Sequence, residues 1–489
     1  MKLGEAITHP VGQVVFASGM TLAIAGLWFV VKDPIVVVGL CLAPIVVIIA
    51  MRDPFPLCLG FIIFSFFRIH EAYPFLEPLK IPKMLALGTI SVLGFHFFFR
   101  RIKPYWRPEL KWLCWFFAHT TVAMFFSAGK PQAIAYWTDT FVKIFIMVFA
   151  IAWLTTTPKR FTIAAASFTL AGVATSVIAI SNALQGIGMV EGSRVTIGRA
   201  NGSVLGDPND LSLVLLFPLA FAVTLVCTKG VGVINRAIGV VGFAVIVWAI
   251  LCTQSRGGLL GIIAIMGLFG LRVIKSKTVL IAIGSIGVMG LFAAAGISGR
   301  SSGGAGESGM VDESAQGRFN AWECAFWMAV DHPLWGVGID NFRYNYYTYS
   351  SMLGTFEGLA KAVHSTWFAA LSEGGFLGFW LFMMVTVGTV KASFKVLSRM
   401  DRAIAAGVPV PAAALAMAAA MPAGMLSFIA SGSFLTQAFT WPLYINVALT
   451  VAVAHYATTI GIDVDGQTPE QVQAGGWMGR LGLRAKPAG

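Results

Sequence analysis

The feature that most constrains this chain is a series of apolar segments, each long enough to cross a bilayer. They recur from near the N-terminus to about residue 456, and a helix needs about 20 such residues to span roughly 30 Å of hydrocarbon. Hydrophobic residues make up 57% of the 489 residues and charged residues only 11%, whereas soluble domains carry about 25% charged residues. The sequence therefore predicts an all-α polytopic membrane protein.

The apolar windows predict about 14 transmembrane helices, with a range of roughly 12 to 14 because window boundaries are loose by several residues. They lie near residues 11–31, 34–51, 54–68, 81–99, 111–127, 137–156, 160–183, 208–227, 231–252, 257–273, 278–297, 364–390, 409–431 and 437–456.

The basic residues predict an orientation for these helices. With the N-terminus inside, the inner connections collect "RRIKPYWRPELK" (100–111), "LRVIKSK" (271–277) and "KASFKVLSRMDR" (391–402). An excess of Lys and Arg in short cytoplasmic connections is the usual pattern in bacterial membrane proteins. Topology thus accounts for the formal net charge of +12, and no nucleic-acid partner is expected. Both termini are predicted to be cytoplasmic.

The chain divides into five regions at this level. The long outer loop begins with a flexible tether, "SGRSSGGAGESG", and the apolar spacing that follows predicts short amphipathic helices on the membrane surface. The regions are 1–183, N-terminal transmembrane helices; 184–297, transmembrane helices with outer loops; 298–363, the long outer loop; 364–456, C-terminal transmembrane helices; and 457–489, a polar tail expected to be disordered.

Arg256 lies in "TQSRGGLLG" (253–261), at the outer mouth of an apolar window that runs inward. The positive end of that helix would face outward, and Gly257 and Gly258 would let backbone N–H groups approach a ligand closely. An arginine at such a position is suited to a phosphate. The alternative is an interfacial arginine that only extends its charge to water.

A second arginine-bearing loop precedes the window at 208–227, with the sequence "RVTIGRANGSVLGDPND" (194–210). Arg199 has no evident helical partner there and is a candidate anion ligand, while Arg194 lies earlier in the same loop. Asp207 before Pro208 is a good helix N-cap. The alternative for Asp207 and Asp210, a metal site, is disfavoured because no other acidic residues cluster nearby.

The stretch "HSTWFAALSEGGFLG" (364–378) carries an imidazole, a carboxylate and glycines into an apolar window. A lone histidine is usually structural, but a helix N-terminus beside His364 disfavours protonation and leaves an imidazole able to accept a proton. Glu373 lies deeper, where a carboxylate is costly unless it is paired or hydrogen-bonded. The predicted helix has Ser365 as its cap and His364 in its first turn, and helical spacing puts His364, Gly375 and Gly378 on one stripe. Glycines on such a stripe would allow a neighbouring helix to come close.

Three motifs together resemble a known family. His364, Ser365, Gly375 and Gly378 fit the pattern His-[Asn/Ser]-x9-Gly-x2-Gly, and Arg256 with Leu260 fits Arg-x3-Leu. Between them, "GRFNAWECAFWMAVDHPLWGVGIDNF" (317–342) is similar to the segment in which an arginine and a tryptophan, here Arg318 and Trp322, precede a glycine-containing turn. From about residue 190 to 455 the chain resembles the O-antigen ligase and polymerase superfamily of bacterial inner-membrane glycosyltransferases.

This resemblance implies a glycan on undecaprenyl diphosphate as donor and a metal-independent, cofactor-free transfer to an acceptor hydroxyl at the periplasmic face. By the same resemblance, loops in 184–297 would bind the donor: Arg256 would hold its diphosphate and Arg199 would assist. His364 would activate or orient the acceptor. Arg318, Glu373 and Arg194 are candidate supporting residues. Expected partners are a saccharide or lipid-linked acceptor, membrane lipids and other polysaccharide assembly proteins.

Two other functions remain open at the level of sequence. One is a flippase or other transporter of lipid-linked glycans, in which the arginines only escort a phosphate; the absence of a visible internal repeat argues weakly against it. The other is a structural partner of the polysaccharide assembly machinery. Within the transferase class, O-antigen or exopolysaccharide polymerases, ligases to lipid A core and protein O-oligosaccharyltransferases share these motifs.

Overall fold

The structure is a computed structural model that describes residues 50–73, 76, 79–295, 313–355 and 361–462, with a few positions between 18 and 28. The predicted windows at 11–31 and 34–51, the tether at the start of the long loop and nearly all of the polar tail lie outside these residues. Within them the chain is helical, apart from one two-stranded hairpin.

The first half of the described chain contains α4 (Phe55–Phe66), η1 (Ile69–Ala72), α5 (Ile81–Phe98), α6 (Pro108–Phe126), α7 (Lys130–Tyr136), the π-helix η3 (Trp137–Phe141), α8 (Val142–Leu154) and α9 (Pro158–Gln185). The antiparallel strands β1 (Met189–Val190) and β2 (Arg194–Val195) follow, then η4 (Arg199–Asn201), η5 (Val204–Gly206), α10 (Pro208–Cys227) and α11 (Val233–Thr253). The remainder comprises α12 (Arg256–Val273), α13 (Lys277–Ala294), α14 (Glu313–Asp331), α15 (Phe342–Met352), α16 (Thr366–Ala405), α17 (Ala412–Gly432) and α18 (Trp441–Thr459).

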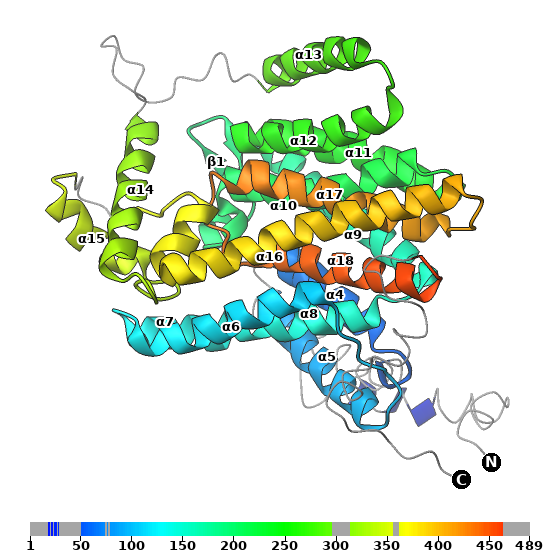
Figure 1. The fold of residues 1–489 in the computed structure, drawn as a ribbon, viewed down its shortest axis with the longest axis horizontal. Coiled ribbons are helices and arrows are strands. Elements are labelled where there is room, and N and C mark those ends of the chain that lie inside the picture. Colours follow the sequence, from blue (N-terminus) through cyan, green and yellow to red (C-terminus); the bar gives the residue numbers. More distant parts are fainter. Residues whose placement is uncertain are drawn as a thin grey trace.

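Most of these helices lie side by side in one bundle (Figure 1). Every apolar window predicted from residue 54 onward coincides with a helix, although α16, with 40 residues, extends well past the predicted 364–390. In the described part of the chain, nine helices are long and apolar enough to cross a membrane, and α4 is a shorter apolar helix. The protein is therefore an all-α, multi-pass membrane protein.

Helix α10 forms the centre of the bundle, and nearly all of its residues from Leu211 to Leu225 are buried. Small residues on its neighbours allow this close packing: a Cβ at Gly172 of α9 would lie 2.5 Å from Pro218, and one at Gly261 of α12 would lie 2.1 Å from Leu216. Helices that associate in lipid commonly use small residues in this way. The middle of α10 is thereby packed closely between α9 and α12.

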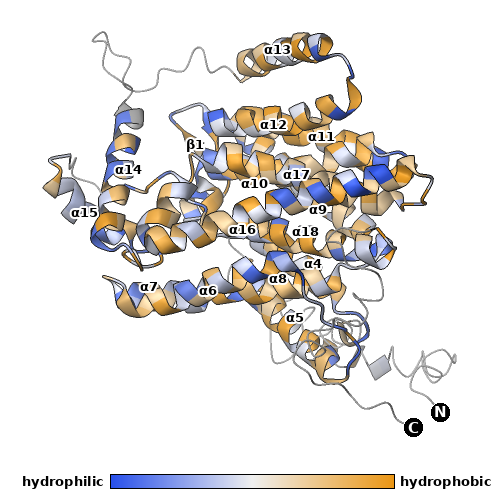
Figure 2. Ribbon diagram, viewed as in Figure 1, coloured by the Kyte–Doolittle hydropathy of each residue, from blue (hydrophilic) through white to orange (hydrophobic). Residues whose placement is uncertain are grey.

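Helix α13 lies apart from the bundle at its edge (Figure 1). None of its residues is buried, and its surface is predominantly hydrophobic (Figure 2). An apolar helix exposed on all sides is expected where a helix faces lipid.

Helix α14 runs across the other helices at one end of the bundle (Figure 1). One face packs on the bundle through Ala321, Ala325 and Met328, while Phe319 and Phe326 are exposed on the other. This is the amphipathic helix that the sequence predicts in the long outer loop. The end of the bundle that α14 crosses also carries β1, β2 and the start of α16, and we call it the His364 end.

Candidate active site

His364 lies immediately before α16, and its backbone is fixed on three sides. Its N–H donates to Thr436 Oγ1 at 3.1 Å, and the carbonyl of the preceding Val363 accepts from Trp322 Nε1 at 2.9 Å. On the other side, Thr366 Oγ1 donates to the carbonyls of Gly432 and Leu435 at 2.6 and 2.9 Å. These contacts hold His364 at a φ of 46°, a left-handed conformation that costs energy for a residue other than glycine.

The start of α16 differs in one detail from the sequence-based expectation. Ser365 is the N-cap, as expected, and accepts from the Phe368 N–H at 3.5 Å. His364 therefore precedes the helix instead of lying in its first turn. The helix is also broken at Gly375, where φ is 66° and ψ is −174°, so His364, Gly375 and Gly378 do not share one continuous helical stripe.

The imidazole of His364 is held towards its neutral form. Burial lowers its pKa below the usual 6.5, and the Arg318 guanidinium lowers it further, whereas the Asp207 carboxylate acts in the opposite direction. Neutral imidazole is what the sequence predicts, although burial is the main cause. The same charges show that residues from α14 and from the N-terminus of α10 lie close enough to His364 to interact with it electrostatically.

Trp322 helps to position His364 through two contacts of its indole ring. Besides its hydrogen bond to Val363, the indole stacks on Phe368 with ring centroids 5.4 Å apart and an interplanar angle of 8°. Arg318 lies one helical turn before Trp322 in α14. The i, i+4 spacing of this pair places a cation and an indole on the side of α14 that faces the start of α16.

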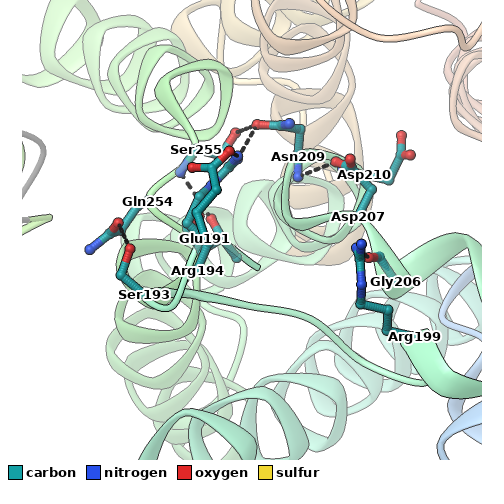
Figure 3. Close-up of polar contacts among 11 residues, drawn as sticks. Glu191, Ser193, Arg194, Arg199, Gly206, Asp207, Asn209, Asp210, Gln254 and Ser255 are labelled. Atoms are coloured by element: carbon teal, nitrogen blue, oxygen red, sulfur yellow. Dashed lines mark hydrogen bonds and ion pairs between the residues drawn. The ribbon is translucent and has the colours of Figure 1, made fainter. Parts of the chain in front are cut away.

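Arg194 is a structural residue in the loop before α10 (Figure 3). Its side chain is buried, with 6% of the residue exposed, and it donates to the Thr253 carbonyl at 3.2 Å and to Asn209 Oδ1 at 2.7 Å. Asn209 Oδ1 also accepts from Ser255 Oγ at 3.0 Å. Arg194 thus joins β2 to the end of α11 and to the first turns of α10 and α12.

Arg199 is exposed in η4 and turns back on its own loop (Figure 3). Its Nη1 donates to the Gly206 carbonyl at 2.9 Å, directly before Asp207. Arg199 therefore closes the loop before α10, and its contact with an anion stays a prediction.

Arg256 is the first residue of α12, and its side chain is exposed. Ser255 caps the helix by accepting from the Gly258 N–H at 3.2 Å, and Ser255 is itself fixed by Asn209. Among the described residues, the Arg256 guanidinium has neither a carboxylate nor a hydrogen-bond partner. The fixed start of α12 thus carries an exposed guanidinium with no partner among the described residues, and we call it the uncommitted arginine.

The glycines after Arg256 serve packing, and the expectation that both expose N–H groups to a ligand is wrong for Gly258. The Gly258 N–H is already bonded to Ser255, and a Cβ there would lie 2.8 Å from Ser212. At Gly257 a Cβ would lie 3.3 Å from Ser431 Oγ, close to the end of α17. These glycines bring α12 against α10 and α17.

The end of α17 connects Arg256 with His364. Ser431 lies against Gly257, the residue after Arg256, and the next residue, Gly432, accepts from Thr366, two residues after His364. The two candidate residues therefore flank the same turn of chain. Residues next to Arg256 and next to His364 thus contact the same end of α17, and a shared site for the two side chains stays a prediction.

Asp207 and Asp210 have the helix-start roles that the sequence favours. Asp207 Oδ1 accepts from the N–H groups of Asn209 and Asp210 at 2.7 and 3.3 Å (Figure 3). Asp210 Oδ1 accepts from Gln437 Nε2 at 2.7 Å. No group of three or more His, Cys, Asp or Glu side chains suited to a metal ion occurs in the part of the chain that the structure describes.

Thr436 and Gln437 are site residues that sequence reasoning missed. Gln437 joins the loop between α17 and α18 to α10, and the adjacent Thr436 accepts the backbone N–H of His364. In the sequence they stand out only as polar residues at a short connection between two apolar windows. That pattern does not identify partners more than 70 positions away in the chain.

Glu373, whose partner the sequence does not reveal, anchors the turn after α14. Its carboxylate accepts from the backbone N–H groups of Asp340 and Phe342, the latter at 3.2 Å from Oε1, at the start of α15. The Val337 and Gly338 N–H groups donate to the backbone carbonyls of Ser372 and Glu373 at 2.9 and 3.2 Å. The turn therefore inserts into the break in α16.

Glycines make this insertion possible. A Cβ at Gly375 would lie 2.6 Å from the Pro333 carbonyl oxygen, and one at Gly336 would lie 2.5 Å from the backbone of Ser372 and Glu373. Gly378 instead accommodates a helix, as expected, because a Cβ there would lie 2.7 Å from His119 of α6. Glu373 is therefore part of the scaffold beneath the site.

The comparisons with known proteins bear on this same region. Residues 241–383 match the family model described as O-antigen ligase. The match begins within α11 and ends within α16, so it includes Arg256, Arg318, His364 and Glu373 but not Arg194 or Arg199. No curated protein matches the chain. The segment from α11 to α16, which holds the imidazole and the uncommitted arginine, is therefore the part of the chain that matches the O-antigen ligase family.

Proposed function

We propose that this multi-pass membrane protein transfers a glycan from undecaprenyl diphosphate to an acceptor hydroxyl at the periplasmic face of the bacterial inner membrane. Glycan transfer of the O-antigen ligase type in polysaccharide assembly follows from the family match. The donor, the face and the residue roles are the proposal. The observation that supports it most is the juxtaposition of a neutral, rigidly held His364 with the uncommitted Arg256.

In the proposed reaction, the acceptor oxygen attacks the anomeric carbon of the donor sugar. His364 takes the hydroxyl proton as the new carbon–oxygen bond forms, which requires a neutral imidazole. The bond to the diphosphate breaks, and negative charge grows on the leaving oxygen. Arg256, assisted by Arg199, stabilises that charge more in the transition state than in the bound donor, because fixed cations need no reorganisation.

This proposal assigns the transfer to the chain's own residues, without a metal. Charge on the leaving diphosphate is offset by arginine and by the positive end of α12. Residues 184–297 would form the donor side of the site, and residues 364–456 would form the acceptor side. The loop 298–363 would cover both, and residues 1–183 would form supporting helices. With basic inner connections, this orientation places both termini in the cytoplasm.

The test is transfer by the purified protein in detergent, supplied with a polyprenyl-diphosphate-linked glycan and an acceptor. His364→Ala and Arg256→Ala should each lower product formation by roughly 10²-fold or more, while protein yield and melting temperature stay unchanged. Lys277→Ala, at an exposed position of the opposite end, is the matched control and should transfer normally. Full transfer by both site variants would overturn the proposal. Glycan movement without product formation would instead indicate a transporter.

A further inference from the structure

A second polar hollow lies at the end of the bundle opposite to His364. It has a volume of about 400 Å³ and is formed where α4 and α9 begin and where α5, α8 and α18 end. Its walls include the basic side chains of Arg52, Arg101, Lys103 and Arg160, together with Asp53 and Tyr105. None of these residues takes part in the candidate active site.

The charges around the hollow are unbalanced. Arg160 is paired with Asp53 at 2.7 Å. Arg52, Arg101 and Lys103 are exposed and have no carboxylate partner among the described residues, although Arg101 also lies over the rings of Phe95 and Phe99. Three uncommitted cations therefore face one cavity that contains a single, already paired carboxylate. Such a cavity favours a ligand with at least one negative charge.

The walls of the hollow are rigid. Arg160 Nη1 donates to the Leu154 carbonyl at 2.8 Å, and its guanidinium lies over the Phe55 ring. Tyr105 stacks on His455 with centroids 3.5 Å apart and donates to the Ala152 carbonyl at 2.7 Å. These contacts fix Arg160 and the aromatic wall before a ligand arrives, which lowers the entropic cost of ordering that part of the cavity.

The position and shape of the hollow indicate a lipid-borne phosphate. It lies level with the helix ends, where phospholipid headgroups lie beside a membrane protein, and Trp153 is a residue type typical of that depth. Pro54, Ile102 and Leu154 add an apolar edge to the polar wall. Phosphate combines the required charge with several acceptor oxygens, to which arginine and lysine both donate.

We propose that this hollow binds the phosphate group of an anionic phospholipid in the leaflet opposite to the active site. The ligand is recognised by Arg52, Arg101 and Lys103, with Arg160 fixed at the back of the cavity. The protein is thereby held at a defined depth and rotation in the membrane by a site separate from the one that carries out transfer.

The test uses the full chain in lipid nanodiscs of phosphatidylcholine with a small fraction of phosphatidylglycerol, and native mass spectrometry counts the retained lipid. The double variant Arg101→Gln/Lys103→Gln should retain phosphatidylglycerol roughly tenfold less well, since each basic residue near an anionic membrane contributes to affinity. Arg52→Gln is a second, milder variant, because it removes one positive charge instead of two. Lys275→Gln/Lys277→Gln, exposed at the same end of the bundle, is the matched control.

Two outcomes separate the alternatives. Selective loss in the hollow variants, with the control unchanged, supports the proposal, and a further arm with inorganic phosphate shows whether the acyl chains contribute. Equal retention in all variants, or an equal loss in the hollow and control variants, would overturn it, because binding would then depend on general surface charge. Transfer activity in detergent is expected to be the same in all of them.

Discussion

The buried junction around Arg194 and the exposed first turn of α12 at Arg256 both involve Asn209 and Ser255. They differ in whether the arginine is available to bind a substrate. At the junction, Arg194 donates to two acceptors, and Asn209 also accepts from Ser255. One residue further along the chain, Arg256 has no such partner among the described residues. Arg194 therefore helps to fix the position of Arg256, through Asn209 and Ser255.

The largest expected effect comes from mutating Arg256 and Arg194 one at a time. Arg256→Ala should lower transfer by roughly 10²- to 10³-fold, the usual loss when a transition-state donor is removed, with no change in thermal stability. Arg194→Ala should instead destabilise the protein by about 2 to 3 kcal/mol, because buried acceptors lose a charged donor. Melting curves beside transfer rates check both. If Arg194→Ala left stability intact, the contrast between the two arginines would be wrong.

A second contrast concerns Glu373, which resembles Arg194 in being buried and fully bonded. Glu373→Ala leaves the Phe342 N–H without its acceptor and should destabilise the protein by about 1 to 3 kcal/mol. Glu373→Gln keeps an acceptor oxygen at that position and should cost much less. Proteolysis of the 332–342 turn in the purified protein measures the difference. Catalytic loss in Glu373→Gln with an intact turn would show that the carboxylate acts beyond its structural role.

The pH profile of transfer sharpens the assignment of His364. Only neutral imidazole accepts a proton, so activity should fall as the pH drops through the lowered pKa of His364. Arg318→Gln removes a charge that lowers this pKa and should move the acid limb to higher pH. Asp207→Asn removes a charge that raises it, keeps the helix cap and should move the limb to lower pH. Shifts in the same direction for both would contradict the assignment.

The smallest effect is expected within α12, at its paired glycines. Gly258→Ala places a methyl group 2.8 Å from Ser212 and should lower the melting temperature. Gly257→Ala meets Ser431 Oγ at 3.3 Å and should change the melting temperature little. Comparable losses of transfer in both variants, without loss of stability, would restore a ligand-binding role for the backbone at this turn.

The sequence predicts the helical class, the helix starts and the chemical candidates well, because these depend on local patterns. Apolar windows and the Asp207 and Ser365 caps are all local. The spacing of residues along the sequence does not show which residues distant in the chain will contact one another. The bonds from Thr436 to His364 and from Glu373 to the turn at 340–342 depend on tertiary packing, and so does the break at Gly375.

The insertion of the 332–342 turn into α16 has a consequence for exchange of loops between relatives. The described part of the long outer loop is fastened at both ends, by Glu373 on one side and by the Trp322 bond to Val363 on the other. It is therefore not an interchangeable module. A chimera that receives a foreign loop must therefore also receive matching residues on α16, beginning with Glu373.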